Sequence, residues 1–143
     1  HLSIRRQRQM CIRDRAKHSV TILLAEDNLI NQKLALSMLT KAGYQVEVAN
    51  NGVEVLDKFT KNPDSINLIF MDVNMPEMDG LEATQQIRKL GFKDIPIIAM
   101  TAAALKEDKE MCFEAGMDDY IAKPIKRELV FSLVDKWVLS RKS

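Results

Sequence analysis

The sequence predicts an α/β fold with a five-stranded parallel sheet that is doubly wound, so that helices cover both faces. Five apolar runs that are too short for helices alternate with stripes of apolar residues at helical spacing. Strand–helix units that repeat in this way build parallel sheets through right-handed crossovers. Because a closed barrel needs more units, an open sheet is favoured. The predicted strands span residues 21–25, 44–49, 67–72, 95–101 and 119–122.

Four connecting helices are predicted from apolar stripes. Gly43, Gly91 and Gly116 each stand just before a predicted strand, where glycine suits the left-handed residue that follows a helix. The pair Asn62–Pro63 ends the second striped helix in another way, because proline cannot continue it. In chain order the stripes are Leu34, Ala35, Met38, Leu39 and Ala42; Val53, Leu56 and Phe59; Leu81, Thr84, Ile87 and Leu90; and Leu129, Val130, Leu133, Val134, Trp137 and Val138.

The segment 105–115 has a thinner apolar face. Leu105, Cys112 and Ala115 form that face, whereas residues 106–110 are all charged. An ordinary helix in contact with solvent explains this pattern most simply, and a weakly anchored helix that shifts at low cost is the alternative. Cys112 is the one cysteine after residue 19, so we interpret it as a small buried side chain in a reducing compartment.

Residues 1–19 are predicted to lie outside the domain. They hold six basic residues and one acidic residue, with no apolar period. A basic tail for nucleic acid or a membrane is the usual interpretation of such a segment. Residues 5–14, however, back-translate into a string that resembles a widely used transposase sequencing adapter. We therefore interpret about residues 1–15 as a library artefact, followed by a short lead-in.

Residues 20–143 form a single domain by length and composition. They carry 15 basic and 19 acidic residues, a net charge of −4, so the argument for a nucleic-acid partner disappears. A chain of this size buries roughly two-thirds of its unfolded surface, which is enough for a core. No stretch approaches the roughly 18–20 apolar residues of a membrane span. We therefore expect no direct contact with nucleic acid or a membrane, and a cytoplasmic location.

Polar side chains stand at the carboxyl ends of four predicted strands. Glu26 and Asp27 follow the first strand, Asp72 ends the third, Thr101 ends the fourth and Lys123 follows the fifth. In an open parallel sheet these ends face one crevice. Carboxylates suit Mg²⁺, which prefers oxygen ligands, and a hydroxyl and an ammonium suit a phosphoryl group. The sequence therefore predicts a site that holds both.

Each of these residues has a simpler structural explanation when it is taken alone. Asp72 would cap a turn, and Lys123 would be a surface lysine. Asp27 or Asn28 would cap the helix that follows. The combination at four strand ends favours the functional interpretation over these separate explanations.

Residues 20–140 resemble the receiver domain of two-component response regulators over their full length. The matching motifs, in order, are LAEDN at 24–28, MDVNMPEMDG at 71–80, IAMTA at 98–102 and YIAKP at 120–124. Their order and spacing together are highly specific. The segment EDNLINQ at 26–32 most resembles receivers attached to hybrid sensor histidine kinases. The resemblance implies the flavodoxin-like strand order 2-1-3-4-5.

The resemblance implies an acceptor and a metal site. Asp72 would be the phosphoacceptor, whose carboxylate attacks phosphorus and forms an acyl phosphate. Asp27, Asp72 and the backbone carbonyl of Asn74 would hold Mg²⁺, with Glu26 binding it through water.

The resemblance also implies a switch. Lys123 would offset charge on the phosphoryl group during transfer. Thr101 would donate a hydrogen bond to that group, and Tyr120 would pack inward as Thr101 moves. The result would be a population shift across the face made by the fourth helix, fifth strand and fifth helix of the domain. A tyrosine that simply packs in the core is compatible with this role.

The implied function is that of a signalling receiver in a phosphorelay. The donor would be a phosphohistidine of a histidine kinase or a histidine phosphotransfer domain, and the receiver would catalyse only its own phosphorylation and dephosphorylation. The native full-length protein would carry an upstream kinase or an output domain, or the domain would stand alone.

Three other protein classes share parts of this pattern. One is a receiver that binds partners without being phosphorylated, against which the intact Asp27, Asp72, Thr101 and Lys123 argue. Another is an aspartyl-phosphate phosphatase, which typically carries a second Asp two residues after the acceptor. A flavin-binding protein of similar topology is the third, but the chain lacks its phosphate-cradling loop. Position 74 is Asn here, which argues against the phosphatase.

Overall fold

The computed structural model describes residues 20–73, 75, 78–101, 106–123 and 125–139. In this part of the chain five strands form one parallel sheet in the order β2-β1-β3-β4-β5. The predicted fold class and strand order are therefore confirmed. The strands are β1 (Thr21–Ala25), β2 (Gln45–Ala49), β3 (Leu68–Asp72), β4 (Ile97–Thr101) and β5 (Asp119–Ala122).

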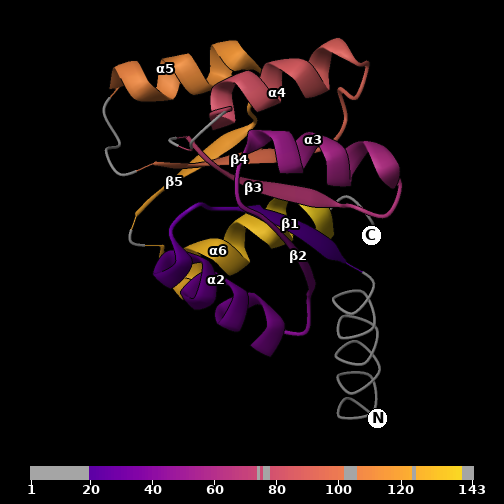
Figure 1. Ribbon diagram of the computed structural model, residues 1–143. Coiled ribbons are helices and arrows are strands. Elements are labelled where there is room, and N and C mark those ends of the chain that lie inside the picture. The colour runs from indigo at the N-terminus through magenta and orange to yellow at the C-terminus, as the bar shows by residue number, and fades with distance from the viewer. Residues whose placement is uncertain (1–19, 74, 76–77, 102–105, 124, 140–143) are drawn as a thin grey trace, which may run out of the picture.

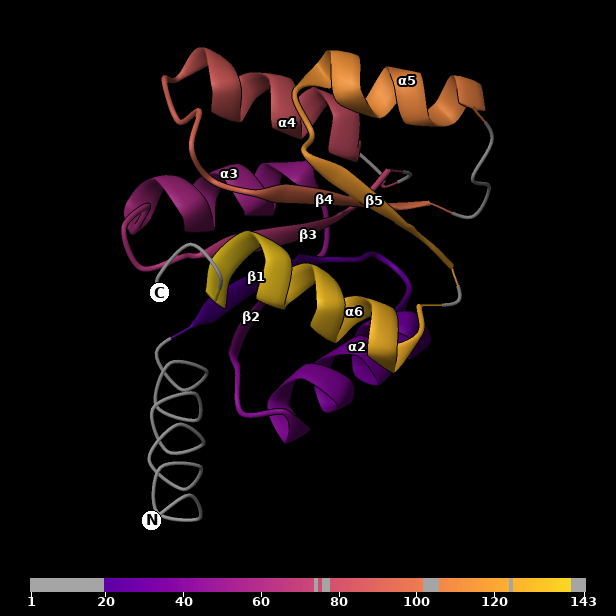
Figure 2. The same cartoon turned by 180° about the vertical axis from the view of Figure 1, so that it is seen from behind.

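Helices cover both faces of the sheet (Figure 1). On one face lie α2 (Leu29–Lys41) and α6 (Arg127–Val134), which Figure 2 shows from behind. On the other lie α3 (Gly52–Lys61), α4 (Gly80–Lys89) and α5 (Lys106–Ala115). A short π-helix, η1 (Asp135–Leu139), continues α6. In these labels the switch face expected from the sequence is made by α5, β5 and α6.

The central strands are buried on both sides, as expected of a parallel sheet covered by two helical layers. Leu24 and Phe70 belong to the cluster under α2 and α6, whereas their neighbours Leu23 and Ile69 belong to the cluster under α3, α4 and α5. This alternation fixes the direction of every strand side chain. It therefore also fixes which side chains emerge at the carboxyl ends of the strands.

The residues in the centre of each predicted apolar stripe are buried or half-buried, as expected, but the stripes are wrong at their edges. Each stripe includes one residue that the structure leaves exposed, because a helix on a sheet buries only a limited arc of its surface. Val55, which the second stripe omitted, is fully buried. The exposed stripe residues are Leu34 (61%), Val53 (48%), Leu90 (58%) and Leu129 (51%).

The predicted helix ends are confirmed. Gly43, Gly91 and Gly116 have φ values of 102°, 101° and 109°, the left-handed conformation that glycine adopts without strain. Within α5 only Cys112 and Ala115 are buried, as the thin apolar face predicted. Cys112 is a buried free thiol.

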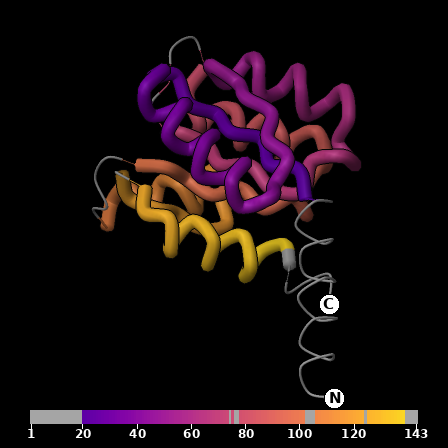
Figure 3. Tube along the Cα trace, turned by 90° about the horizontal axis from the view of Figure 1, so that it is seen from below, coloured from indigo at the N-terminus to yellow at the C-terminus, as the bar shows by residue number. Residues whose placement is uncertain are grey.

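The first and last described segments meet at one end of the molecule (Figure 3). Val20, just before β1, and Val138, in η1, are buried in the same cluster. Residues 1–19 lie outside the described part of the chain, so their interpretation stays a prediction. None of the described helices is long and apolar enough to cross a membrane.

Arg88 binds several main-chain segments in the α3–α4–α5 layer. It lies at the end of the sheet opposite the carboxyl ends of the strands. From α4 it donates to the carbonyl oxygens of Phe92 and Ile95 at 2.9 Å each and of Gly116 at 3.0 Å. It also donates at 3.0 Å to Asp118, whose carboxylate in turn accepts from the Ile97 amide at 2.9 Å. One guanidinium thus links α4 to the segments that enter β4 and β5.

The Arg88→Met variant is expected to lose about 2 kcal/mol of unfolding free energy, because several carbonyls and the Asp118 carboxylate lose a partly buried donor. Chemical denaturation measures this loss. Lys89→Met, which replaces the exposed neighbouring cation by the same apolar residue, is the control and should stay within about 0.5 kcal/mol of the parent protein. Equal stability of the two variants would contradict the role of Arg88.

Candidate functional site

Three carboxylates meet at the carboxyl ends of β1 and β3. One oxygen each from Glu26, Asp27 and Asp72 can be chosen so that all lie within 4.8 Å of one another. Glu26 and Asp72 are only 2% and 3% exposed, whereas Asp27 is exposed to solvent. Oxygen ligands that converge in this way suit a hard divalent cation, and their mutual repulsion favours binding one.

Lys123 joins this group from the end of β5. Its Nζ lies 2.8 Å from Glu26 Oε2 and 2.9 Å from Asp72 Oδ2. The Lys123 amide donates to the Thr101 carbonyl at 2.8 Å, which holds the start of this segment beside β4. One ammonium therefore bridges two buried carboxylates from different strands.

Glu26 is held by hydrogen bonds to its main chain and side chain. Its amide donates to the Ala49 carbonyl at 3.1 Å, and its Oε1 accepts from the Asn28 amide at 3.1 Å. The Gln32 side chain donates at 2.9 Å to the Glu26 carbonyl and also to Asn50 Oδ1. Gln32 was missed by the sequence interpretation, because nothing in its position marks it as a support for Glu26.

Asn28 is the residue that caps α2. Its Oδ1 accepts from the amides of Ile30 and Asn31 at 3.0 and 3.1 Å. This decides between the two caps considered from the sequence, Asp27 and Asn28. Because Asn28 satisfies the helix amides, the Asp27 carboxylate lies in the carboxylate group instead.

Gly80 sets how closely α4 approaches the end of β3. A Cβ at this position would lie 2.3 Å from the Asp72 carbonyl oxygen and 2.8 Å from Met71 Cγ. The Gly80 amide donates to the Val73 carbonyl at 3.2 Å, and Asp79 caps the helix by accepting from the Glu82 amide at 2.9 Å. The Asp–Gly pair before a helical stripe was the available signal, but the sequence interpretation gave Gly80 no role.

Thr101 and Tyr120 lie outside the carboxylate group. Thr101 is 7% exposed at the end of β4, which lies between β3, where Asp72 is the last residue, and β5, which Lys123 follows. Tyr120 is half-buried and packs edge-to-face against Phe113 of α5, with ring centroids 6.5 Å apart. Lys109 Nζ lies 4.5 Å from the centre of the Tyr120 ring. Asn74 lies outside the described residues.

Burial and pairing oppose each other at this site. Burial raises the pKa of the Glu26 carboxyl above its ordinary value, although hydrogen bonds from Lys123 and Asn28 work in the opposite direction. Burial also works to lower the pKa of Lys123, but its hydrogen bonds and charge interactions with Glu26 and Asp72 outweigh this and raise it. The Lys123 ammonium therefore stays charged at neutral pH, whereas burial disfavours the ionised form of the Glu26 carboxyl, whose pKa is raised.

The family of the chain follows from comparison with known sequences. Residues 22–135 match the model of the response regulator receiver domain. The chain belongs to this family. The resemblance inferred from the four motifs is therefore confirmed.

Relatives of the chain include hybrid sensor kinases. It is 40% identical over 124 residues to hybrid signal transduction histidine kinase M of Dictyostelium discoideum, covering 84% of the chain and 5% of the relative. It is 43% identical over 109 residues to the sensor histidine kinase RcsC of Escherichia coli K12, covering 76% of the chain and 11% of the relative. The chain thus matches only a small part of these proteins.

Solved structures of receivers share the fold. The receiver domain of a Pseudomonas aeruginosa sensor histidine kinase, with magnesium in its active site cleft, aligns with a TM-score of 0.77 and 38% identity. That alignment covers 83% of this chain and 97% of the Pseudomonas receiver chain. The receiver of yeast Ssk1, crystallised with the histidine phosphotransfer protein Ypd1, aligns with a TM-score of 0.80 and 28% identity, covering 86% and 91%.

The raised pKa of Glu26 predicts how stability changes with pH in the absence of metal. A carboxyl whose folded pKa is raised favours folding at low pH, and that contribution is lost as pH rises through the folded pKa. Glu26→Gln removes the ionisable group, so the variant does not lose stability by this route as pH rises. In chelator, the variant should therefore become progressively more stable than the parent protein as pH rises above the ordinary value of 4.5.

Urea denaturation at a series of pH values measures the difference. Glu47→Gln, on an exposed residue of β2, is the matched control and should follow the parent protein throughout. A Glu26→Gln variant that loses stability relative to the parent at neutral pH would show that pairing with Lys123 outweighs burial.

Proposed function

We propose that this domain is a phosphorylatable receiver of a two-component phosphorelay and that Asp72 is its phosphoacceptor. The observation that carries the proposal is the bridge from Lys123 to the buried Asp72 and Glu26 at 2.9 and 2.8 Å. A buried carboxylate oriented by an ammonium, beside further carboxylates, is prepared for an incoming phosphoryl group and a divalent cation.

In the proposed transfer, a carboxylate oxygen of Asp72 attacks the phosphorus of a donor phosphohistidine. The new bond is an acyl phosphate, and the electron pair of the broken P–N bond stays on the donor imidazole. The Lys123 ammonium, held by Asp72 and Glu26, stabilises negative charge on the phosphoryl oxygens. Thr101 supplies a hydroxyl donor from the neighbouring strand end.

We infer that the site uses Mg²⁺. Asp27 and Asp72 would bind it directly, Glu26 through water, and the Asn74 carbonyl would be a further ligand, a prediction that falls outside the described residues. The convergence of the three carboxylates supports this assignment. When bound, the ion neutralises charge on the phosphoryl oxygens.

The output would pass through the face made by α5, β5 and α6. Tyr120 contacts α5 through Phe113 and Lys109, so an inward movement of its ring would remove two contacts from a helix with only two buried residues. We propose that Thr101 and Tyr120 move together and shift the population of this face.

The proposed donor is a histidine kinase or a histidine phosphotransfer domain. Leu29, Ile30 and Leu34 of α2 are 61%, 71% and 61% exposed near the carboxylate group, and exposed apolar patches mark contact surfaces. We propose this patch as the donor's docking surface. The full-length protein would join the domain to an upstream kinase or an output domain. The cytoplasmic location of the domain stays a prediction.

Incubation with a small phosphodonor and Mg²⁺ is expected to add one phosphoryl group to the protein, detected as intact mass. Asp72→Asn should remove the adduct completely, because an amide cannot form the acyl phosphate. Asp79→Asn is the matched control and should be phosphorylated normally, since Asn also caps helices well. No adduct on the folded parent protein would favour a receiver that binds partners without phosphorylation.

The Asp27→Asn variant is expected to bind Mg²⁺ roughly tenfold more weakly or worse, because it replaces a charged oxygen ligand by a neutral one. Titration calorimetry measures the affinity without any phosphodonor. Asp64→Asn, an exposed carboxylate in the turn before β3, is the control and should bind as the parent does. An unchanged affinity in Asp27→Asn would exclude Asp27 as a ligand.

A further inference from the structure

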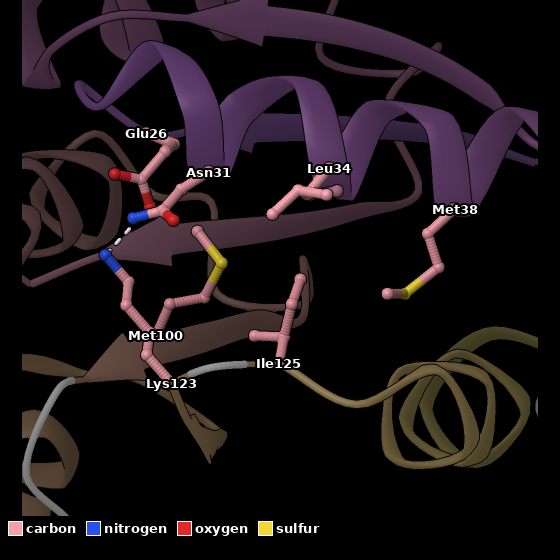
Figure 4. Close-up of a pocket in the computed structure, with 8 residues that line it drawn as sticks. Glu26, Asn31, Leu34, Met38, Met100, Lys123 and Ile125 are labelled. Carbon is pink, nitrogen blue, oxygen red and sulfur yellow. Dashed lines mark ion pairs between the residues drawn. The ribbon is translucent and has the colours of Figure 1, made fainter.

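Gln32 connects α2 to the ends of two strands beside the carboxylate group. Its side-chain Nε2 lies 2.9 Å from the Glu26 carbonyl oxygen, directly after β1, and 2.9 Å from Asn50 Oδ1, directly after β2. The carboxamide therefore uses one of its two N–H donors for each acceptor. Figure 4 shows Glu26 paired with Lys123 beside α2, the helix that carries Gln32.

We propose that Gln32 is a positioning residue for the cation site and that it acts by fixing the peptide unit between Glu26 and Asp27. The inference rests on the proposed Mg²⁺ site, in which Asp27 is a direct ligand. Gln32 holds main chain rather than a carboxylate, so its effect on the cation is indirect.

The direction of the hydrogen bond to Glu26 is set by a neighbouring carboxylate. Glu54 Oε1 accepts from Asn50 Nδ2 at 3.3 Å, and an ionised carboxylate can only accept. Asn50 must therefore turn its oxygen toward Gln32, and Gln32 must turn its NH₂ group toward Asn50. The same NH₂ group then meets the Glu26 carbonyl, which also only accepts. The two side-chain amides thus have one consistent orientation.

Hydrogen bonds fix the main chain on both sides of Asp27. The peptide unit before it contains the Glu26 carbonyl, which Gln32 binds. The peptide unit after it contains the Asn28 amide, which donates to Glu26 Oε1 at 3.1 Å. Because Asp27 is exposed to solvent, the direction of its carboxylate depends on this main chain rather than on packing. Loss of Gln32 would release the first of the two peptide units.

The main test measures Mg²⁺ affinity by titration calorimetry, without any phosphodonor. Gln32→Met keeps the length of the side chain and removes both donors. It is expected to weaken Mg²⁺ binding roughly tenfold, as loss of a group that orients a metal ligand does. Gln85→Met, the same change at an exposed position of α4, is the control and should bind as the parent does. Gln32→Ala tests the same point if Gln32→Met does not fold.

Two further measurements separate positioning from a general structural role. In the Asp27→Asn background, Gln32→Met should change Mg²⁺ affinity by less than about twofold, because the charged ligand that Gln32 positions is already gone. In chelator, the amide resonance of Asp27 should shift in Gln32→Met, since the Asp27 N–H belongs to the same peptide unit as the Glu26 carbonyl. A loss of folding stability alone produces neither result.

Parent-like Mg²⁺ affinity in the folded Gln32→Met variant would overturn the proposal and leave the proposed cation site intact. An unshifted Asp27 resonance, or an equal loss of affinity in the Asp27→Asn background, would show that Gln32 does not act through this peptide unit, and would overturn it as well. A parent protein that binds no Mg²⁺ would instead overturn the cation site, and this inference with it.

Discussion

The shared ammonium of Lys123 is the interaction on which the site depends. It brings together a residue after β5 with residues at the ends of β1 and β3, and it lies 2.8 and 2.9 Å from two buried carboxylates. Buried carboxylates without a partner are costly, so each needs this cation or another one. The parallel sheet makes the meeting possible, because its strands all end at the same edge. The contact of Lys123 with Glu26 and Asp72 therefore both stabilises the buried carboxylates and forms part of the proposed reactive site.

Near the site, the helices are capped by residues other than the carboxylates of the functional group. Asn28 caps α2 and Asp79 caps α4, which leaves Asp27 and Asp72 in the carboxylate group. Gly80 lets α4 begin against the carbonyl of Asp72, at a distance no side chain would allow. Asp72 is the last residue of β3, and Glu26 and Asp27 follow directly after β1, so the carboxylates stand next to the sheet, which favours precise positioning of reacting groups.

The sequence predicted the sheet, its faces and the residues at the strand ends, because these depend on local patterns of apolar and polar residues. It did not predict contacts that depend on the exact approach of two elements. The role of Gly80 arises from the distance between α4 and β3, and that of Gln32 from its reach to both Glu26 and Asn50. Leu34 was placed in an apolar stripe, yet it is exposed at the rim of a cavity, because a stripe does not reveal where the opposing surface ends.

The helical layer over β3, β4 and β5 is anchored unevenly, and this bears on how a signal would leave the site. Arg88 ties α4 to the segments entering β4 and β5 through four hydrogen bonds. By contrast, α5 buries only Cys112 and Ala115 and leaves Met111 and Phe113 about half exposed. Local movement is least costly where few apolar contacts are lost. If Tyr120 follows Thr101 as proposed, α5 is therefore the helix that would move, while α4 would keep Asp72 in place.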